Sequence, residues 1–152
     1  MLDKQETDIN QRIQSSLEQL PGAAPQKAGA LHATLARWYW ELAYLGLAQG
    51  SVQQHVLGQA GEHAEQALKL GEGGELLLLA GRIALERGDV GKARLHMHQA
   101  EEAGMDPAKV LPFRAEIAFE TGRYAEIPGL LRSLPAQMQQ RPPFAGLVRT
   151  WT

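Results

Sequence analysis

A chain of 152 residues is long enough to form one domain with a buried core, and 44% hydrophobic residues is ordinary for a globular protein. The formal net charge is -2, with both signs interspersed, so the basic excess typical of nucleic-acid-binding proteins is missing and we expect no nucleic-acid partner. The absence of cysteine excludes disulfide bonds, thiol catalysis and thiolate metal ligands.

The longest apolar run, residues 76–80, is far too short to cross a bilayer, so we expect no membrane span. The first residues, MLDKQETDINQ, lack the basic and apolar regions of a secretory signal. We therefore expect a cytoplasmic protein, although a fragment of a longer exported chain would show the same features.

The first predicted helix covers residues 3–20, where apolar side chains recur at helical spacing and Asp3 with Glu6 resembles a capping box. A Pro-Gly pair ends this helix and opens a short linker over residues 21–27. The next apolar residues again alternate three and four apart, which predicts a long amphipathic helix over residues 28–50.

The remaining segments also predict helices. One begins after Ser51, a good N-cap residue, and stops at the glycine cluster of residues 71–74. Two helix pairs follow, at residues 75–88 with 89–104 and at residues 107–122 with 123–135. No stretch shows the β-branched alternation of strands, and the connections are short. We therefore predict an all-α fold in which neighbouring helices are antiparallel.

Two of the predicted pairs are related by an internal repeat. Aligning Gly88 with Gly122 superposes three further pairs of identical residues at an offset of 34. These pairs are Ile83 and Ile117, Ala84 and Ala118, and Glu86 and Glu120. Both glycines are expected to adopt a positive φ, which ends one helix and turns the chain into the next.

An offset of 34 is the period of a tetratricopeptide repeat, and the segment resembles that family. Small residues, Gly81 and Ala115, stand where the two helices of a hairpin would cross, and Asp106 with Pro107 opens the next unit. The resemblance is good over residues 75–135. It is degenerate over residues 28–74, where aligning Gly50 with Gly88 requires an offset of 38.

The resemblance implies a single domain that forms a right-handed superhelix of antiparallel helix hairpins. The expected parts are an N-terminal helix, a linker, three repeats and a C-terminal capping segment, over residues 1–20, 21–27, 28–74, 75–106, 107–135 and 136–152. The first helices of the hairpins would line a concave groove. A peptide or helix of a partner protein would bind in that groove.

The resemblance also implies which side chains face the partner. They are Arg37, Trp40, Tyr44, Leu47, Arg82, Leu85, Glu86, Lys109, Glu116, Phe119 and Glu120. Trp40, Tyr44, Arg82 and Phe119 are the predicted anchors, because Trp, Tyr and Arg are frequent hot-spot residues. The alternative for the aromatic residues is that they seal helices against one another. The positions that hold a carboxylate clamp in chaperone-binding members carry other residues here, so we do not expect that activity.

The C-terminal stretch RPPFAGLVRTWT predicts a further helix with Phe144, Leu147, Val148 and Trp151 on one face. This face would cap the last repeat. Alternatively it is a second contact surface, and the protein is a self-assembling scaffold or a fixed subunit of a larger complex.

Catalysis has no support in the sequence. The five histidines form no metal-binding motif, and we expect each to be structural or solvent-facing. His55 and His63 share a helical face but lie about 12 Å apart along the axis. No nucleophile, base and orienting residue form one constellation. We predict a non-catalytic adaptor without metal or cofactor, and a helical metal-dependent enzyme is the least favoured hypothesis.

Overall fold

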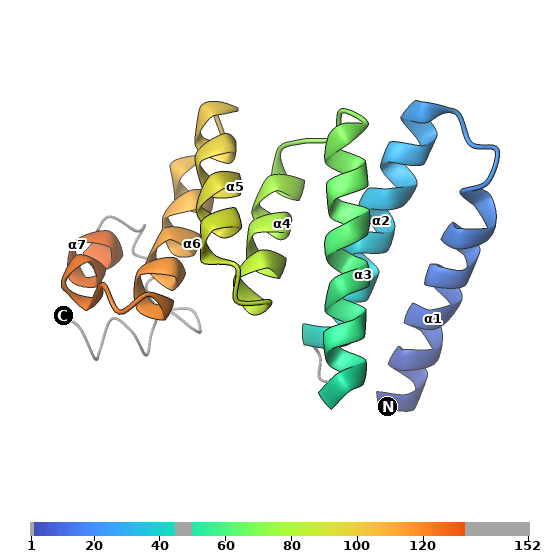
Figure 1. The fold of residues 1–152 in the computed structure, drawn as a ribbon, viewed down its shortest axis with the longest axis horizontal. Helices are drawn as coiled ribbons and strands as arrows, with labels where there is room; N and C mark the ends of the chain where they lie inside the picture. The colour runs from blue at the N-terminus through green and yellow to red at the C-terminus, as the bar shows by residue number, and fades with distance from the viewer. Residues whose placement is uncertain (1, 45–49, 133–152) are drawn as a thin grey trace.

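The computed structural model describes residues 2–44 and 50–132 (Figure 1). These residues form seven α-helices and one 3-10 turn, and none of them lies in a strand. The elements are α1 Leu2–Gln19, α2 Pro25–Tyr44, α3 Gly50–Lys69, α4 Glu75–Glu86, α5 Val90–Glu102, α6 Pro107–Glu120, the 3-10 turn Tyr124–Glu126 and α7 Ile127–Arg132. The predicted all-α fold class is confirmed.

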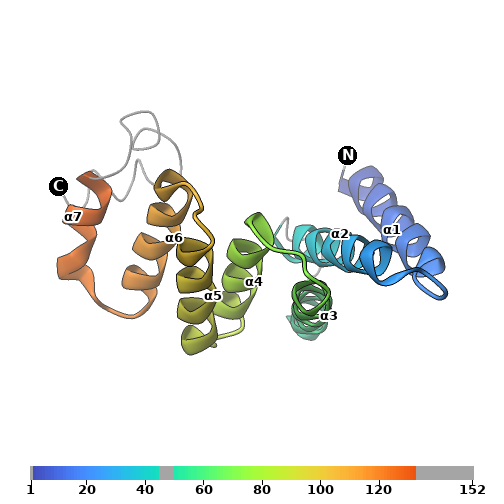
Figure 2. The same cartoon turned by 90° about the horizontal axis from the view of Figure 1, so that it is seen from above.

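The helices follow one another along the long axis of the molecule, from α1 at one side of Figure 1 to α7 at the other. The most extensive helix contacts are those of α2 with α3 and of α4 with α5. Figure 2 shows α3 displaced to one side of the row. Helix α4 also contacts α2 and α6, so alternate helices of the row meet as well.

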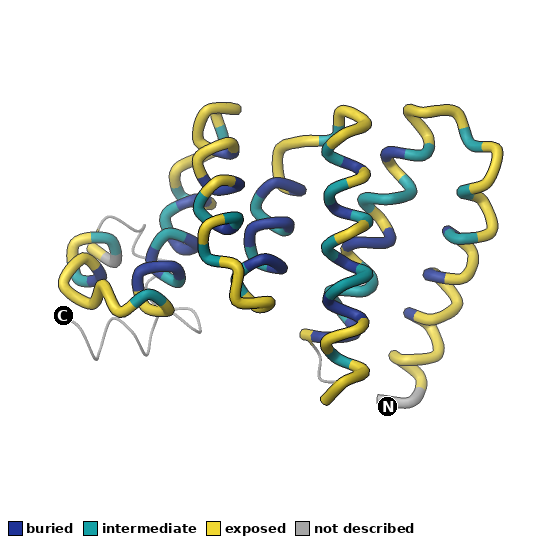
Figure 3. Tube along the Cα trace, in the orientation of Figure 1, coloured by how far each residue is buried: buried dark blue, intermediate teal, exposed yellow. Residues whose placement is uncertain are grey.

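The buried residues of the described chain alternate with exposed ones along the helices (Figure 3), and their side chains form three clusters that each join several helices. The first joins α1, α2 and α3 around Leu35, and the second joins α2, α3 and α4 around Ile83. The third joins α4, α5 and α6 around Phe113, which is fully buried. Each hairpin therefore covers its apolar surface with the help of a neighbour, which ties the row together.

Glycines end four of the helices in the same way. Gly71, Gly88, Gly104 and Gly122 all have φ between 75° and 98°. The amide of Asp89 donates to the carbonyl of Ala84 at 2.8 Å, and the amide of Arg123 donates to the carbonyl of Ala118 at 2.8 Å. These are the six-to-one bonds of a Schellman motif. The positive φ predicted for Gly88 and Gly122 is confirmed.

Helices α4 and α6 lie side by side with equivalent residues facing each other. Lys109 pairs with Glu75, and Glu116 pairs with Arg82 at 3.2 Å. In both pairs the partners are 34 residues apart, which is the offset of the sequence repeat. Since the two pairs occur in the same order along both helices, α4 and α6 run in the same direction.

Three predicted helix starts are wrong. Helix α2 begins at Pro25, so the last residues of the expected linker are helical, since proline fits the first turn of a helix. Helix α1 includes Asp3 and helix α3 includes Ser51, so neither is an N-cap residue. The last predicted helix is a 3-10 turn followed by α7, in which Pro128 occupies the first turn, where it removes no helical hydrogen bond.

Some predictions concern residues that the structure does not describe. These are the contact residue Leu47, the capping segment of residues 136–152, and its face of Phe144, Leu147, Val148 and Trp151.

Candidate functional site

A groove of about 550 Å³ lies between α2, α4 and α6. Its lining residues are Arg37, Trp40 and Glu41 from α2, Glu75, Leu78, Leu79 and Arg82 from α4, and Lys109 and Pro112 from α6. Four of the predicted contact residues, Arg37, Trp40, Arg82 and Lys109, are thus brought together on one surface.

The middle of the groove is apolar and firmly held. Trp40 packs against both the first and the second core cluster, and Leu78 packs against the third. Because these side chains are held by the core, the groove is formed without any partner. Tyr44 extends this surface, since its ring stacks on Trp40 with the centroids 5.8 Å apart while 70% of the residue is exposed.

Charged side chains from all three helices meet at the end of the groove where α4 and α6 begin. Lys109 donates a hydrogen bond to Glu75, and Arg37 on α2 contributes further positive charge. The hydrogen bond and charge of Lys109 lower the pKa of the Glu75 carboxyl, and the hydrogen bond and charge of Glu75 raise the pKa of Lys109. Both partners are exposed, so the pair adds little to stability. Asp106 also acts on Lys109, so two cations and two carboxylates meet at this end.

The opposite end of the α4–α6 surface is acidic. Arg82 pairs with Glu116 at 3.2 Å, and its guanidinium lies 5.8 Å from the centroid of the Phe113 ring. Burial raises the pKa of Glu116, Arg82 opposes this shift, and the neighbouring charges of Glu86 and Glu120 add to it. Three carboxyl groups, those of Glu86, Glu116 and Glu120, therefore lie near one guanidinium at this end.

The other predicted contact residues lie away from the groove. Leu85 packs against the third core cluster, which gives it a structural contact. Phe119 meets Tyr124 edge to face at 5.9 Å and is 42% exposed, near the end of α6. The sequence reasoning missed Glu41 and Leu79 as lining residues. Helical spacing alone could have found Glu41, which lies four residues after Arg37 on the same helix.

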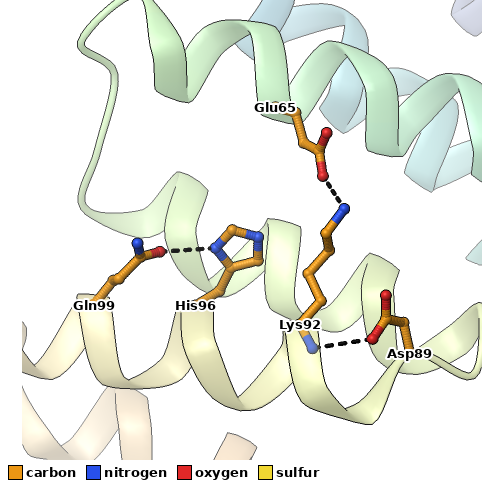
Figure 4. A network of polar contacts seen from close by, with 5 residues as sticks. All are labelled: Glu65, Asp89, Lys92, His96 and Gln99. Atoms are coloured by element: carbon orange, nitrogen blue, oxygen red, sulfur yellow. Dashed lines mark hydrogen bonds and ion pairs between the residues drawn. The ribbon is translucent and has the colours of Figure 1, made fainter.

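A second depression of about 540 Å³ opens between α3, α4 and α5. Figure 4 shows its polar side chains, in which Lys92 of α5 pairs with Glu65 of α3 and the amide of Lys92 donates to Asp89. The hydrogen bond from Lys92 is the main cause of the lowered pKa of Glu65. His96 is buried and bonds to Gln99 at 2.9 Å. The Lys92–Glu65 pair links α5 to α3, and the other two bonds join residues at or within α5.

Two histidines from different helices form a contact that the sequence did not reveal. The Nδ1 atoms of His32 on α2 and His63 on α3 lie 2.8 Å apart. The ring of His63 also stacks on Tyr39, with the planes 3° apart. Burial lowers the pKa of both histidines, and for His63 the charge of His32 lowers it further while Glu62 raises it. No signal on one helix predicts a pair 31 residues apart.

Within residues 2–44 and 50–132, no group of three or more His, Asp and Glu side chains could hold a metal ion. In the same ranges, no helix combines the length and hydrophobicity that a bilayer-spanning helix needs. The fold and the groove define the chain as an all-α protein of packed helices. No family model matches the sequence, and neither the curated proteins nor the solved structures include a significant match.

Proposed function

We propose that this protein is a non-catalytic interaction module that binds a peptide or helix of a partner protein in the groove between α2, α4 and α6. We further propose that its helices form a tetratricopeptide-like, right-handed superhelix, and that it acts as an adaptor in the cytoplasm. One observation carries the proposal. Residues at equivalent positions of three successive hairpins, Arg37, Glu75 and Lys109, converge on one groove.

The chemistry of the groove indicates what the partner segment carries. An apolar side chain would fill the middle, between Trp40, Leu78 and Pro112. Because Pro112 has no amide hydrogen, the carbonyl of Ala108 lacks its usual helical donor. These contacts suit an extended segment or a short amphipathic helix.

The charges give the segment a direction. A carboxylate on the partner would approach Arg37 and Lys109 in the groove, and a lysine or arginine would approach the acidic cluster of Glu86, Glu116 and Glu120 beyond the groove. Such charges set orientation and association rate more than affinity. We therefore expect bound segments to carry an acidic residue, an apolar anchor and a basic residue, in the order set by the groove.

Peptide selection from a random library on the folded protein tests the proposal, followed by fluorescence polarisation titrations of the selected peptides. K109E reverses an exposed charge in the groove, E86K reverses an exposed charge in the acidic cluster beyond it, and W40L removes the central aromatic surface. Each should weaken binding by about 5- to 30-fold, equivalent to roughly 1–2 kcal/mol. E102K, an exposed charge reversal on α5, is the matched control.

Circular dichroism would first establish that each variant keeps the helical content of the wild type. Peptides that bind wild type, W40L and E86K with equal affinity would place the binding surface elsewhere and refute the proposed groove. A selection that enriches no peptide with an apolar anchor would have the same consequence.

A further inference from the structure

The imidazole rings of His32 and His63 meet between two helices, with one ring nitrogen of each facing the other. Their Nδ1 atoms are 2.8 Å apart, and both side chains are half-buried. The helices that carry them, α2 and α3, are the two longest and make the most extensive contact in the described chain. The pair therefore sits on a rigid part of the molecule, away from the groove proposed for peptides.

The contact between the two rings has a particular chemistry. In the hydrogen bond, the Nδ1 of one ring carries a proton and the Nδ1 of the other ring accepts it with a lone pair. Because both rings are neutral, the donor ring has no proton on Nε2 and the acceptor ring has one there. If the first ring moves its proton from Nδ1 to Nε2 through solvent, both Nδ1 lone pairs point at the same place. No net proton is released in this step, and two neutral imidazoles then face one position.

We propose that His32 and His63 bind one divalent late first-row transition-metal ion, of the Zn²⁺ and Cu²⁺ class, through their Nδ1 atoms. Imidazole nitrogen is a preferred ligand of these ions, whereas Mg²⁺ and Ca²⁺ prefer oxygen. Water completes the coordination shell, because no third His or carboxylate of the described residues joins the pair in a metal-binding group. The bound ion links α2 directly to α3.

Binding needs an adjustment of both rings. The rings meet head-on, since their centroids lie 5.1 Å apart and their Nδ1 atoms 2.8 Å apart. Two ligands at 2.0–2.1 Å from a tetrahedral Zn²⁺ place their nitrogens about 3.3 Å apart, so the rings must separate by about 0.5 Å and each lone pair must turn by roughly 35° toward the ion. Half-buried rings can make this movement by rotating about their side-chain bonds while both helices stay in place. Stacking on Tyr39, with the ring centroids 5.6 Å apart, holds the plane of His63.

The surroundings favour the neutral rings that a metal requires. Burial lowers the pKa of both histidines, so neither competes strongly for a proton at neutral pH. The charged groups that act on the pair are His32 and His63 themselves and Glu62, whose negative charge also attracts a cation. The phenol of Tyr39 stays neutral, since burial raises its pKa.

Thermal unfolding of the untagged full chain with increasing ZnCl₂ tests the site. An ion that binds only the folded state raises the melting temperature, by about 3–6 °C when the metal reaches ten times the Kd. MgCl₂ at the same concentrations should give no shift. H32Q and H63Q should each abolish the Zn²⁺ shift. The double variant H55Q/H98Q, which removes two exposed histidines, should retain it.

Electron paramagnetic resonance of the protein with one equivalent of CuCl₂ gives an independent readout. The wild type should show superhyperfine coupling to two equivalent imidazole nitrogens, and H63Q should show fewer. A Zn²⁺ shift that survives in H32Q and H63Q, or is absent in the folded wild type, would overturn the proposal. If H32Q fails to fold, the copper spectrum of H63Q still decides between the outcomes. Loss of the two-nitrogen coupling supports the site, and its persistence overturns it. Peptide binding in the groove is a separate property, so this site can fail while the proposed function holds.

Discussion

Adding one methyl group to Gly81 is the sharpest test of the packing between hairpins. A Cβ atom at this position would lie 2.7 Å from Cε1 and 2.8 Å from Cζ of Phe113, and 3.5 Å from the carbonyl oxygen of Ala93. Gly81 is buried in α4, Ala93 belongs to α5 and Phe113 to α6. Because Phe113 is fully buried, its ring has no open space into which to move.

Two opposing effects set the size of the change in stability. Overpacking a close-packed core costs about 1–3 kcal/mol. Replacing glycine by alanine inside a helix returns about 0.5–1 kcal/mol, because it lowers the entropy of the unfolded chain. We therefore expect G81A to lower the free energy of unfolding by roughly 1–2 kcal/mol, which corresponds to a fall in melting temperature of about 2–8 °C.

Gly58 provides a matched control, since it lies inside α3 and a Cβ there would meet nothing within 4 Å. G58A should raise the free energy of unfolding by about 0.5–1 kcal/mol. Urea denaturation followed by circular dichroism measures both variants. The double variant G81A/F113L should lose less stability than the sum of its single changes, because leucine relieves the clash. A G81A protein as stable as G58A would refute the close approach of α4 and α6.

Three further predictions concern the turns and the histidine pair. D89A removes the side chain that accepts the amide of Lys92 at the N-cap of α5 and should cost about 1 kcal/mol in urea denaturation. G122A forces φ of 75° on a residue with a Cβ and should cost about 1–2 kcal/mol, measured in the same way. Acid should also weaken the contact of His32 with His63. Burial lowers both pKa values below the ordinary 6.5, so the unfolded chain takes up protons first and stability falls as the pH drops below about 6.5. H63Q should make the free energy of unfolding depend less on pH below about 6.5. An unchanged slope in H63Q would contradict the assignment of this pH dependence to the buried histidine pair.

The features predicted best from the sequence are those set by local chemistry. Glycine is the residue that adopts a positive φ without strain, so Gly88 and Gly122 predicted where two helices end. The spacing of these two glycines also gave the offset of the repeat. Helical periodicity likewise predicted the all-α fold. The groove residues Arg37 and Lys109 followed from the repeat, because equivalent positions of stacked hairpins face the same side.

The features that escaped prediction depend on contacts between helices. The pairing of His32 with His63 requires the relative shift of α2 and α3, which spacing along one helix does not contain. The packing of Leu85 against the third core cluster has the same origin, since it depends on how α5 and α6 pack against α4. Helix starts were also misplaced, because Ser51 and Asp3 suit both an N-cap and the first turn of a helix.

Repeated residues differ in one respect between the core and the surface formed by α4 and α6, and this difference concerns the expected partner. Some core and turn positions carry identical residues, as for Ile83 with Ile117, Ala84 with Ala118 and Gly88 with Gly122. At two groove positions the repeated residues have opposite charge, since identical charges would face each other across α4 and α6 and repel.

Glu86 and Glu120 depart from that rule. They are equivalent in the repeat, carry the same charge and both act on Glu116, so the fold gains nothing from their proximity. A basic side chain of a bound partner would neutralise this cluster, and E86K should then stabilise the free protein while weakening the complex. A variant that weakened both would show that the cluster serves the fold, and that the partner's cation binds elsewhere.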